Sequence, residues 1–182
     1  GEYITRWDAD DLGPIDKLAT LAGELMLTEN PTVVTGLVIY FNDSEPVSEG
    51  YQRYQTWLNA TLLHGLHYRD IYRECTVASP NWMCRKADLL QIGGFDNLTY
   101  PEDYDLLFRW YTNSWDMRCV DRVTLYWREH PHRTSRTSAL YDQHSFFRLK
   151  IEHFLRLDYQ REKQLVLWGN GIKAKLVRRI LN

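Results

Sequence analysis

The chain has 182 residues, a formal net charge of −2 and a hydrophobic content of 44%, with charged residues making up a further 25%. This composition is typical of a soluble globular protein and excludes disordered and fibrous classes. Because the net charge is slightly negative, the chain lacks the basic field that drives non-specific binding to nucleic acid, so we expect no nucleic-acid partner.

The chain carries no signal for a membrane span or for export. No apolar run approaches the roughly 20 residues that a membrane-spanning helix needs, and the first residues do not have the organisation of a signal peptide. The three cysteines, Cys75, Cys84 and Cys119, lack metal-type spacing, and their odd number fits a reducing compartment better than a disulfide framework. We therefore expect a cytoplasmic protein without a transmembrane segment.

The hydrophobic pattern alternates between the periods of strands and helices, which indicates an α/β fold. β-branched and aromatic runs predict strands or extended chain at 3–7, 33–41, 75–83 and 117–127. Apolar residues at helical spacing predict helices at 14–27, 51–66, 85–90, 102–110 and 140–154.

Residues 161–182 have the pattern of a separate unit. Residues 164–168 predict a strand, Gly169-Asn170-Gly171 a tight turn, and residues 174–181 a basic amphipathic helix, the order that opens a Rossmann-type domain. A single G-x-G is weak evidence for dinucleotide binding, and the alternative is a strand-turn-helix that packs on the main domain. We predict two units, 1–160 and 161–182.

Three carboxylates, Asp8, Asp10 and Asp11, follow the first predicted strand and precede the Gly13-Pro14 turn. Carboxylates this close repel one another unless a cation offsets their charge, which indicates a metal-nucleotide site. The alternative is that they cap backbone N–H groups at a turn.

A second acidic group, Glu102 and Asp103, stands at a predicted helix start shortly after Gly93-Gly94. Carboxylates in a first helical turn are favoured by the helix dipole, so they have a structural explanation. The double glycine suggests in addition a backbone that passes close to a bulky ligand.

The two acidic groups and two further segments resemble the family-2 glycosyltransferases of the GT-A fold. The segments that carry the resemblance are Asp8-Ala9-Asp10-Asp11, Gly93-Gly94-Phe95, Glu102-Asp103-Tyr104-Asp105-Leu106 and Tyr126-Trp127-Arg128-Glu129-His130. Each motif is weak alone, but their order and spacing from Asp8 to about Ser138 make a specific combination.

The resemblance implies a partial GT-A fold, with a mixed central sheet flanked by helices. Family members open with a βαβ unit that binds the base of the nucleotide, and the chain lacks this unit. Residues 1–160 therefore look like the C-terminal part of a GT-A domain, and we expect the chain to be a fragment of a longer enzyme, truncated at the N-terminus and at the C-terminus. An exposed sheet edge would favour pairing between copies.

The resemblance also implies an inverting transfer of a sugar from a nucleotide-sugar, first of all a UDP-sugar, to a saccharide or glycolipid acceptor. Asp103 would be the general base on the acceptor hydroxyl, and Glu102 would orient it or hold the acceptor. Gly93, Gly94 and Trp82 would line the acceptor side, with Tyr100 as a further wall.

For the donor side, the resemblance implies a divalent metal, Mn²⁺ or Mg²⁺, that neutralises the departing diphosphate. Asp10 would ligate the metal together with His130, for which His132 is a possible substitute. The residues expected to contact the donor are Asp8, Asp11, Arg128 and Arg133.

Two other interpretations remain open. The first is a degenerate, non-catalytic transferase-like module for assembly or carbohydrate recognition. The second is a metal-dependent phosphotransferase or nucleotidyltransferase, which predicts phosphate-binding glycines or a Lys beside Asp8 that the sequence does not show. Family membership would place the enzyme at the inner face of a membrane, in polysaccharide or glycolipid synthesis.

Overall fold

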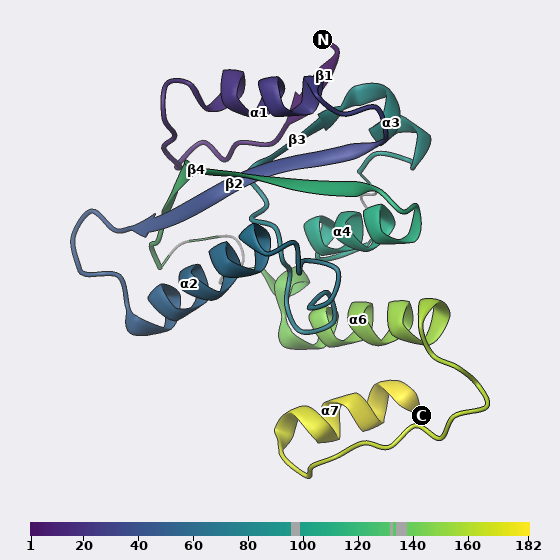
Figure 1. Cartoon of the computed structure of the whole chain (residues 1–182). Coiled ribbons are helices and arrows are strands. Elements are labelled where there is room, and N and C mark those ends of the chain that lie inside the picture. Colours follow the sequence, from purple (N-terminus) through teal and green to yellow (C-terminus); the bar gives the residue numbers. More distant parts are fainter. Residues whose placement is uncertain (96–98, 132, 134–137) are drawn as a thin grey trace.

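The computed structural model describes residues 1–95, 99–131, 133 and 138–182. The described chain contains a four-stranded sheet with the strand order β1-β3-β2-β4 and helices on both faces (Figure 1). The strands are β1 (Tyr3–Thr5), β2 (Thr32–Phe41), β3 (Trp82–Arg85) and β4 (Asp116–Arg128). β2 runs parallel to β4, whereas β3 pairs antiparallel with both β1 and β2. This arrangement confirms the predicted α/β class and its mixed sheet.

Helices lie on both sides of the sheet, and the last two helices of the chain lie farther out on one side (Figure 1). The helices are α1 (Lys17–Met26), α2 (Glu49–Leu63), α3 (Lys86–Gln91), α4 (Glu102–Thr112), α6 (Gln143–Leu157) and α7 (Ile172–Leu181), with a 3₁₀ turn η1 (Ala139–Tyr141) before α6. α1 packs on one face, while α2 and α4 cover the opposite face. Among the described residues, no helix has the length and apolar content needed to cross a bilayer.

The core lies mainly between the sheet and the layer of α2 and α4. Val33, Val38 and Leu125 from the sheet are fully buried there, together with Leu58 of α2 and Leu107 of α4. A smaller cluster on the other face joins Val34 and Met83 to Leu21 and Leu25 of α1. Burial on both faces explains why β2 is an almost unbroken apolar run rather than an alternating one.

Gly36 lies in β2 where the ladder with β4 is irregular. An added Cβ would stand 2.4 Å from the Thr124 hydroxyl and 2.9 Å from the Arg122 carbonyl oxygen. We therefore expect Gly36→Ala to lower the free energy of unfolding by about 1–3 kcal/mol through overpacking, as measured by urea denaturation.

A matched control for Gly36 lies in α1. An added Cβ at exposed Gly23 meets no atom within 4 Å, so Gly23→Ala should raise stability by about 0.5–1 kcal/mol through helix propensity. Equal midpoints for the Gly36→Ala variant and the unchanged protein would contradict the close approach of β4.

Two sequence predictions differ from the structure. Of the extended segment expected at 75–83, a strand forms only from Trp82, and a turn with an Asn81 N–H to Ala78 O bond of 2.9 Å precedes it. The strand expected at 164–168 is wrong, since these residues belong to no strand in the described sheet. α7 forms as predicted and packs against α6.

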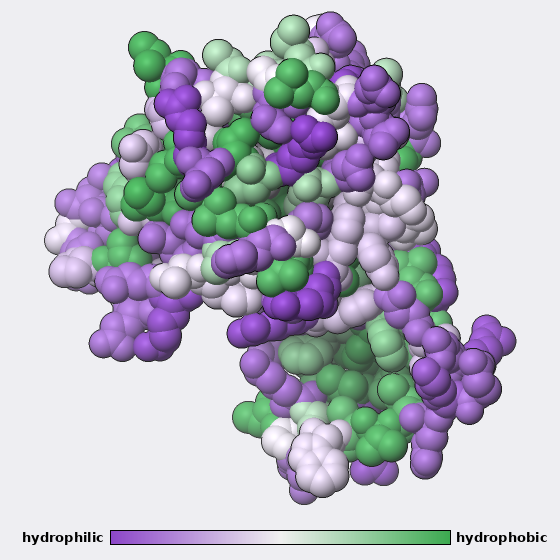
Figure 2. All heavy atoms as spheres, viewed as in Figure 1, coloured by the Kyte–Doolittle hydropathy of each residue, from purple (hydrophilic) through white to green (hydrophobic). Residues whose placement is uncertain are grey.

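Residues 164–168 leave apolar side chains exposed, including Val166 at 68% and Trp168 at 95%. The surface of this part of the molecule, around α6 and α7, carries many hydrophobic side chains (Figure 2). The strand is absent because a single extended segment gains hydrogen bonds only from a neighbouring strand. The assignment of 161–182 to a second domain stays a prediction.

Candidate functional site

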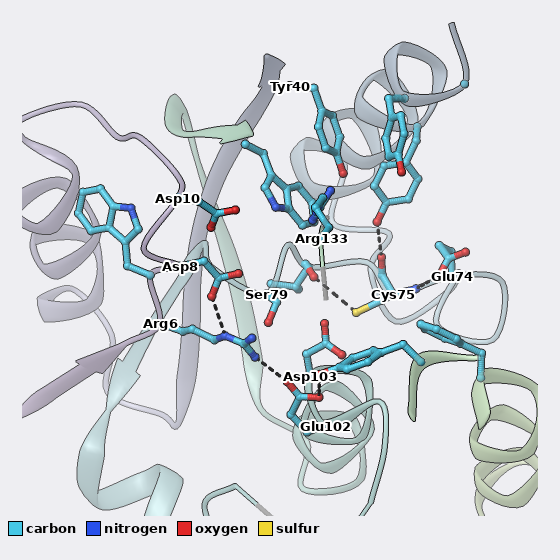
Figure 3. Close-up of a pocket in the computed structure, with 18 of the residues that line it drawn as sticks. Arg6, Asp8, Asp10, Tyr40, Glu74, Cys75, Ser79, Glu102, Asp103 and Arg133 are labelled. Carbon is cyan, nitrogen blue, oxygen red and sulfur yellow. Dashed lines mark hydrogen bonds and ion pairs between the residues drawn. The ribbon is translucent and has the colours of Figure 1, made fainter. Parts of the chain in front are cut away.

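A cavity of about 840 Å³ lies at the carboxyl ends of β1, β2 and β4 (Figure 3). Its walls come from the loop after β1, the N-terminal turns of α2 and α4, the segment before β3, and η1 with α6. Its volume is in the range of ligand sites, and open α/β sheets bind ligands at this edge. Of the predicted site residues, the cavity brings together Asp8, Asp10, Glu102, Asp103 and Arg133.

The acidic loop, residues 8–11, is a turn fastened to the end of β4. The Asp11 N–H donates to the Asp8 carbonyl at 3.2 Å, and Leu12 exchanges two backbone hydrogen bonds with Tyr126. Asp11 is 8% exposed, and its Oδ1 accepts a bond of 2.8 Å from the Arg128 backbone N–H. Asp11 therefore braces the loop and is absent from the described cavity lining, whereas Asp8 and Asp10 belong to it.

Burial raises the pKa of Asp11 to about 6, and the charges of Asp10 and Asp8 act in the same direction. Lys17, also buried, donates from Nζ to the Pro80 carbonyl at 2.9 Å, and its charge interacts favourably with Asp11 and Asp8. Sequence reasoning overlooked this lysine, since it lies at the start of α1 rather than next to Asp8 in the chain.

Arg6 joins the two acidic groups across the cavity (Figure 3). Its Nε lies 3.2 Å from Asp8 Oδ1, and its Nη1 lies 2.8 Å from Glu102 Oε1. The other Glu102 oxygen accepts a bond of 2.5 Å from the Tyr141 hydroxyl. Although burial acts to raise the pKa of Glu102, the bonds from Tyr141 and Arg6 together lower it. Glu102 is thus held ionised and fixed.

Asp103 points into the cavity from the first turn of α4 (Figure 3). Its Oδ1 accepts the Tyr104 N–H at 2.8 Å. Burial raises the pKa of Asp103 to about 6, and the neighbouring charge of Glu102 adds to this effect. A carboxylate with a raised pKa, placed on a cavity wall beside a fixed carboxylate, has the properties of a general base.

Asp10 and His130 form a pair at the rim of the cavity. His130 Nε2 lies 2.8 Å from Asp10 Oδ2, and this hydrogen bond is the main reason for the lowered pKa of Asp10. Arg128 donates from Nε to the Asp10 carbonyl at 2.6 Å and forms an ion pair with Asp43. Arg128 therefore supports the acidic loop and is not among the described lining residues. His132 lies outside the described residues.

Among the described residues, no three His, Cys, Asp or Glu side chains converge as a ready set of metal ligands. Asp10 and His130 nevertheless fit a site that the substrate completes, since Mg²⁺ and similar ions are often bound by one or two protein ligands plus phosphate oxygens and water. The net charge of the described cavity lining also favours a bound cation. Five carboxylates and two guanidinium groups are present among the described lining residues, so an added diphosphate requires a cation.

Aromatic rings form the wall opposite α4, which sequence reasoning did not assign. Tyr40 stacks on Trp127 with ring centroids 4.9 Å apart, and Tyr51 packs against Tyr40 at 5.1 Å. The Arg133 guanidinium lies 4.7 Å from the Trp127 ring centroid and 3.1 Å from Glu129 Oε2. These rings come from β2, α2 and β4, and their convergence depends on the fold rather than on a local motif.

Other predicted site residues lie away from the described cavity lining. Gly93 and Gly94 end α3 with positive φ angles of 90° and 61°, and their N–H groups bond to the Leu90 and Leu89 carbonyls at 3.1 and 2.9 Å. This is a Schellman-type helix end, which accounts for both glycines. Trp82 is 2% exposed and packs edge-on against Trp110 in the core.

Tyr100, the remaining wall candidate, packs edge-on against Tyr141 with centroids 5.9 Å apart. Tyr141 lines the cavity, whereas Tyr100 is not among its described lining residues.

Comparison with known proteins adds no assignment, because no protein-family model and no curated protein sequence matches the chain.

Proposed function

We propose that the chain is part of an inverting glycosyltransferase with a partial GT-A fold, which moves a sugar from a nucleotide-sugar to a saccharide or glycolipid acceptor. One observation carries the proposal. Asp8 and Asp10 at the end of β1 and Asp103 at the start of α4 line one cavity of about 840 Å³, although they are far apart in the sequence. A single-displacement sugar transfer needs both groups, one beside the diphosphate and one beside the acceptor hydroxyl.

On the donor side, Asp10 and His130 would hold Mn²⁺ or Mg²⁺. The ion would supply positive charge to the departing diphosphate. Asp8 and Arg133 line the same cavity and would contact the donor, since Arg133 offers N–H groups to phosphate oxygens. Asp11 and Arg128 would act indirectly, because both fix the backbone of the acidic loop.

On the acceptor side, Asp103 would take the proton of the acceptor hydroxyl as that oxygen forms a bond to the anomeric carbon. The bond from this carbon to the diphosphate oxygen breaks, and its electron pair leaves with the nucleoside diphosphate. Attack from the face opposite to the leaving group inverts the anomeric centre. Glu102, held by Arg6 and Tyr141, would keep a negative charge next to Asp103 and so favour the proton's arrival.

The non-catalytic alternative has its own supporting observation. Asp8 already forms an ion pair with Arg6, and Asp10 shares a hydrogen bond with His130, so both carboxylates have a partner in the protein without a metal ion. A module that recognises carbohydrate through the aromatic wall would need no more than this.

The two functions are distinguished by an assay of the protein with a panel of nucleotide-sugars and Mn²⁺, in which the released nucleoside diphosphate is measured with and without saccharide acceptors. Release that requires the metal supports the transferase. Absence of release across the panel, with saccharide binding still detectable by NMR, supports the non-catalytic module.

The pH dependence of the reaction follows from the Asp103 carboxyl, whose pKa is raised to about 6. The base must be ionised, so kcat/KM should be constant well above pH 6 and fall about tenfold per pH unit below it. Initial rates from pH 4.5 to 8 at fixed ionic strength measure this limb. A flat profile through pH 6 would contradict the assignment of Asp103.

A further inference from the structure

The C-terminal tip, defined here as residues 161–182, differs in charge from the rest of the protein. It contains six basic residues and one acidic residue, whereas the whole chain has 22 Lys and Arg residues against 24 Asp and Glu residues. All six basic side chains belong to exposed residues, namely Arg161, Lys163, Lys173, Lys175, Arg178 and Arg179. A basic end on a weakly acidic protein favours a partner that carries negative charge.

The C-terminal tip also exposes a run of apolar side chains. Every residue from 161 to 170 is exposed, including the four consecutive apolar residues 165–168. Trp168 is 95% exposed, and Ile172 at the start of α7 is 83% exposed. Figure 2 shows hydrophobic side chains gathered on this part of the molecule. Single exposed apolar residues are ordinary, but a contiguous group of this kind marks an interaction surface.

The basic and apolar groups of the tip lie at the same outer end of the molecule. α7 packs against α6, and its half-buried residues include Leu176 and Ile180, whereas Lys175 and Arg179, one turn apart, are both exposed. The segment between α6 and α7 passes along the side of α7 that is away from α6 (Figure 1). A partner that approaches this end therefore meets cationic and apolar side chains together.

A bilayer that contains anionic lipids fits both properties of the tip. Its phosphate groups attract the basic side chains, and its headgroup region accepts Trp168 and the neighbouring aliphatic side chains, since tryptophan is favoured at the boundary between water and acyl chains. The tip of a second copy would bring like charges together. Nucleic acid offers phosphates, but it offers little apolar surface to side chains such as Val166 and Ile172.

We propose that the C-terminal tip is a membrane-binding surface, which places Trp168 and its apolar neighbours among the headgroups of an anionic bilayer while the basic side of α7 contacts lipid phosphates. The protein lies on the bilayer through this surface and does not span it. Membrane binding through the tip does not depend on sugar transfer, so it holds equally for the transferase and for the non-catalytic module.

The test compares two kinds of vesicle, one of phosphatidylcholine alone and one of phosphatidylcholine and phosphatidylglycerol in equal amounts. Binding of the protein is measured by co-sedimentation at neutral pH. The mixed vesicles should bind the protein at least about tenfold more tightly, and added salt should weaken this binding, because the surface potential of the anionic lipid is screened.

A double variant tests the charge of the tip. Lys175→Gln with Arg179→Gln should weaken binding to the mixed vesicles at least about tenfold, since two basic side chains near the lipid surface are lost. Arg53→Gln with Lys86→Gln is the matched control, because it removes the same charge from exposed residues of α2 and α3. The control should bind as the unchanged protein does.

A single variant tests the apolar part of the tip. Trp168→Ala should weaken binding to the mixed vesicles about fivefold, and it should not disturb the fold, since the side chain is exposed. Leu27→Ala is the matched control, because Leu27 is 72% exposed at the end of α1. This control should leave binding unchanged.

Equal binding to the two kinds of vesicle would overturn the membrane-binding surface, as would an equal loss in the two double variants. Two further outcomes would replace the bilayer by another partner. A dimer in sedimentation velocity that Trp168→Ala abolishes would make the tip an interface between copies. Binding of duplex DNA as tight as that of the mixed vesicles, and unaffected by Trp168→Ala, would make it a surface for nucleic acid.

Discussion

Replacing Asp103 by Asn is expected to abolish sugar transfer while donor binding stays largely intact. The amide keeps the size and the hydrogen bond from the Tyr104 N–H, but it cannot accept the proton of the acceptor hydroxyl. The loss should amount to ~10²–10⁴-fold in kcat, the usual contribution of a positioned general base. Turnover with a competent donor and acceptor measures the first quantity, and calorimetry with the nucleoside diphosphate measures the second.

The same substitution should not destabilise the fold at neutral pH. Folding raises the pKa of Asp103 to about 6, so its contribution to stability is greatest below the ordinary pKa of Asp, ~3.8, and is lost as the pH rises through about 6. Above pH 6 the buried carboxylate is ionised at a cost in stability, and the neutral amide of Asn does not have this cost. The stability of Asp103→Asn relative to the unchanged protein should therefore increase from pH 4 to pH 7, and thermal unfolding at the two values measures it.

Asp121→Asn is the control for this experiment, because Asp121 is an exposed carboxylate in β4 outside the described cavity lining. It should leave turnover unchanged. Turnover near that of the unchanged protein in Asp103→Asn would show that Asp103 is not the base.

The sequence predicted the elements whose stability depends on their own pattern. β2 follows from a run of β-branched and aromatic residues, and α4 from apolar residues at helical spacing after Pro101. The resemblance also implied that Asp8 and Asp103 belong to one site, and both line the cavity. The mixed sheet with helices on both faces confirms the α/β class.

Two predictions differ from the structure because the same sequence pattern can arise for more than one structural reason. Gly93-Gly94 was interpreted as a close approach to a ligand, but the pair ends α3 through left-handed backbone angles. A double glycine serves either purpose, and the sequence alone does not distinguish them. Residues 164–168 have strand-like composition, but a strand requires a neighbour, and composition says nothing about whether one is present.

The residues that sequence reasoning missed act over long sequence distances. Arg6 forms an ion pair with Glu102, 96 positions away. Tyr51 packs against Tyr40, which stacks on Trp127. One local signal was available for Arg6. Side chains two apart in an extended segment point to the same side, so the spacing of Arg6 and Asp8 could have indicated a pair between them. No comparable signal marks Tyr51, because an aromatic residue in a helix is equally suited to a core.

Asp10 is the position where we expect the second large effect. Asp10→Ala removes the carboxylate proposed to hold the metal, so the metal-dependent affinity for a nucleoside diphosphate should fall by about two orders of magnitude, or about 2.7 kcal/mol in binding free energy. Calorimetry with and without Mn²⁺ measures it. The unchanged protein should bind more tightly with Mn²⁺, while the variant should give one weak affinity in both conditions. Asp16→Ala, which removes an exposed carboxylate paired with Arg122, should behave as the unchanged protein.

A His130 variant provides a second test of whether the metal binds at Asp10. Its Nε2 lies 2.8 Å from Asp10 Oδ2, so a cation that binds both groups must replace this hydrogen bond. His130→Ala leaves the carboxylate available and should reduce the metal-dependent affinity less than Asp10→Ala does, because a carboxylate contributes charge that a neutral imidazole lacks. If Mn²⁺ still strengthens binding in Asp10→Ala as much as in the unchanged protein, the metal site lies elsewhere and the acidic loop is a turn whose carboxylates satisfy Arg6, Arg128 and His130. If neither variant nor the unchanged protein responds to Mn²⁺, the internally paired loop favours the non-catalytic module.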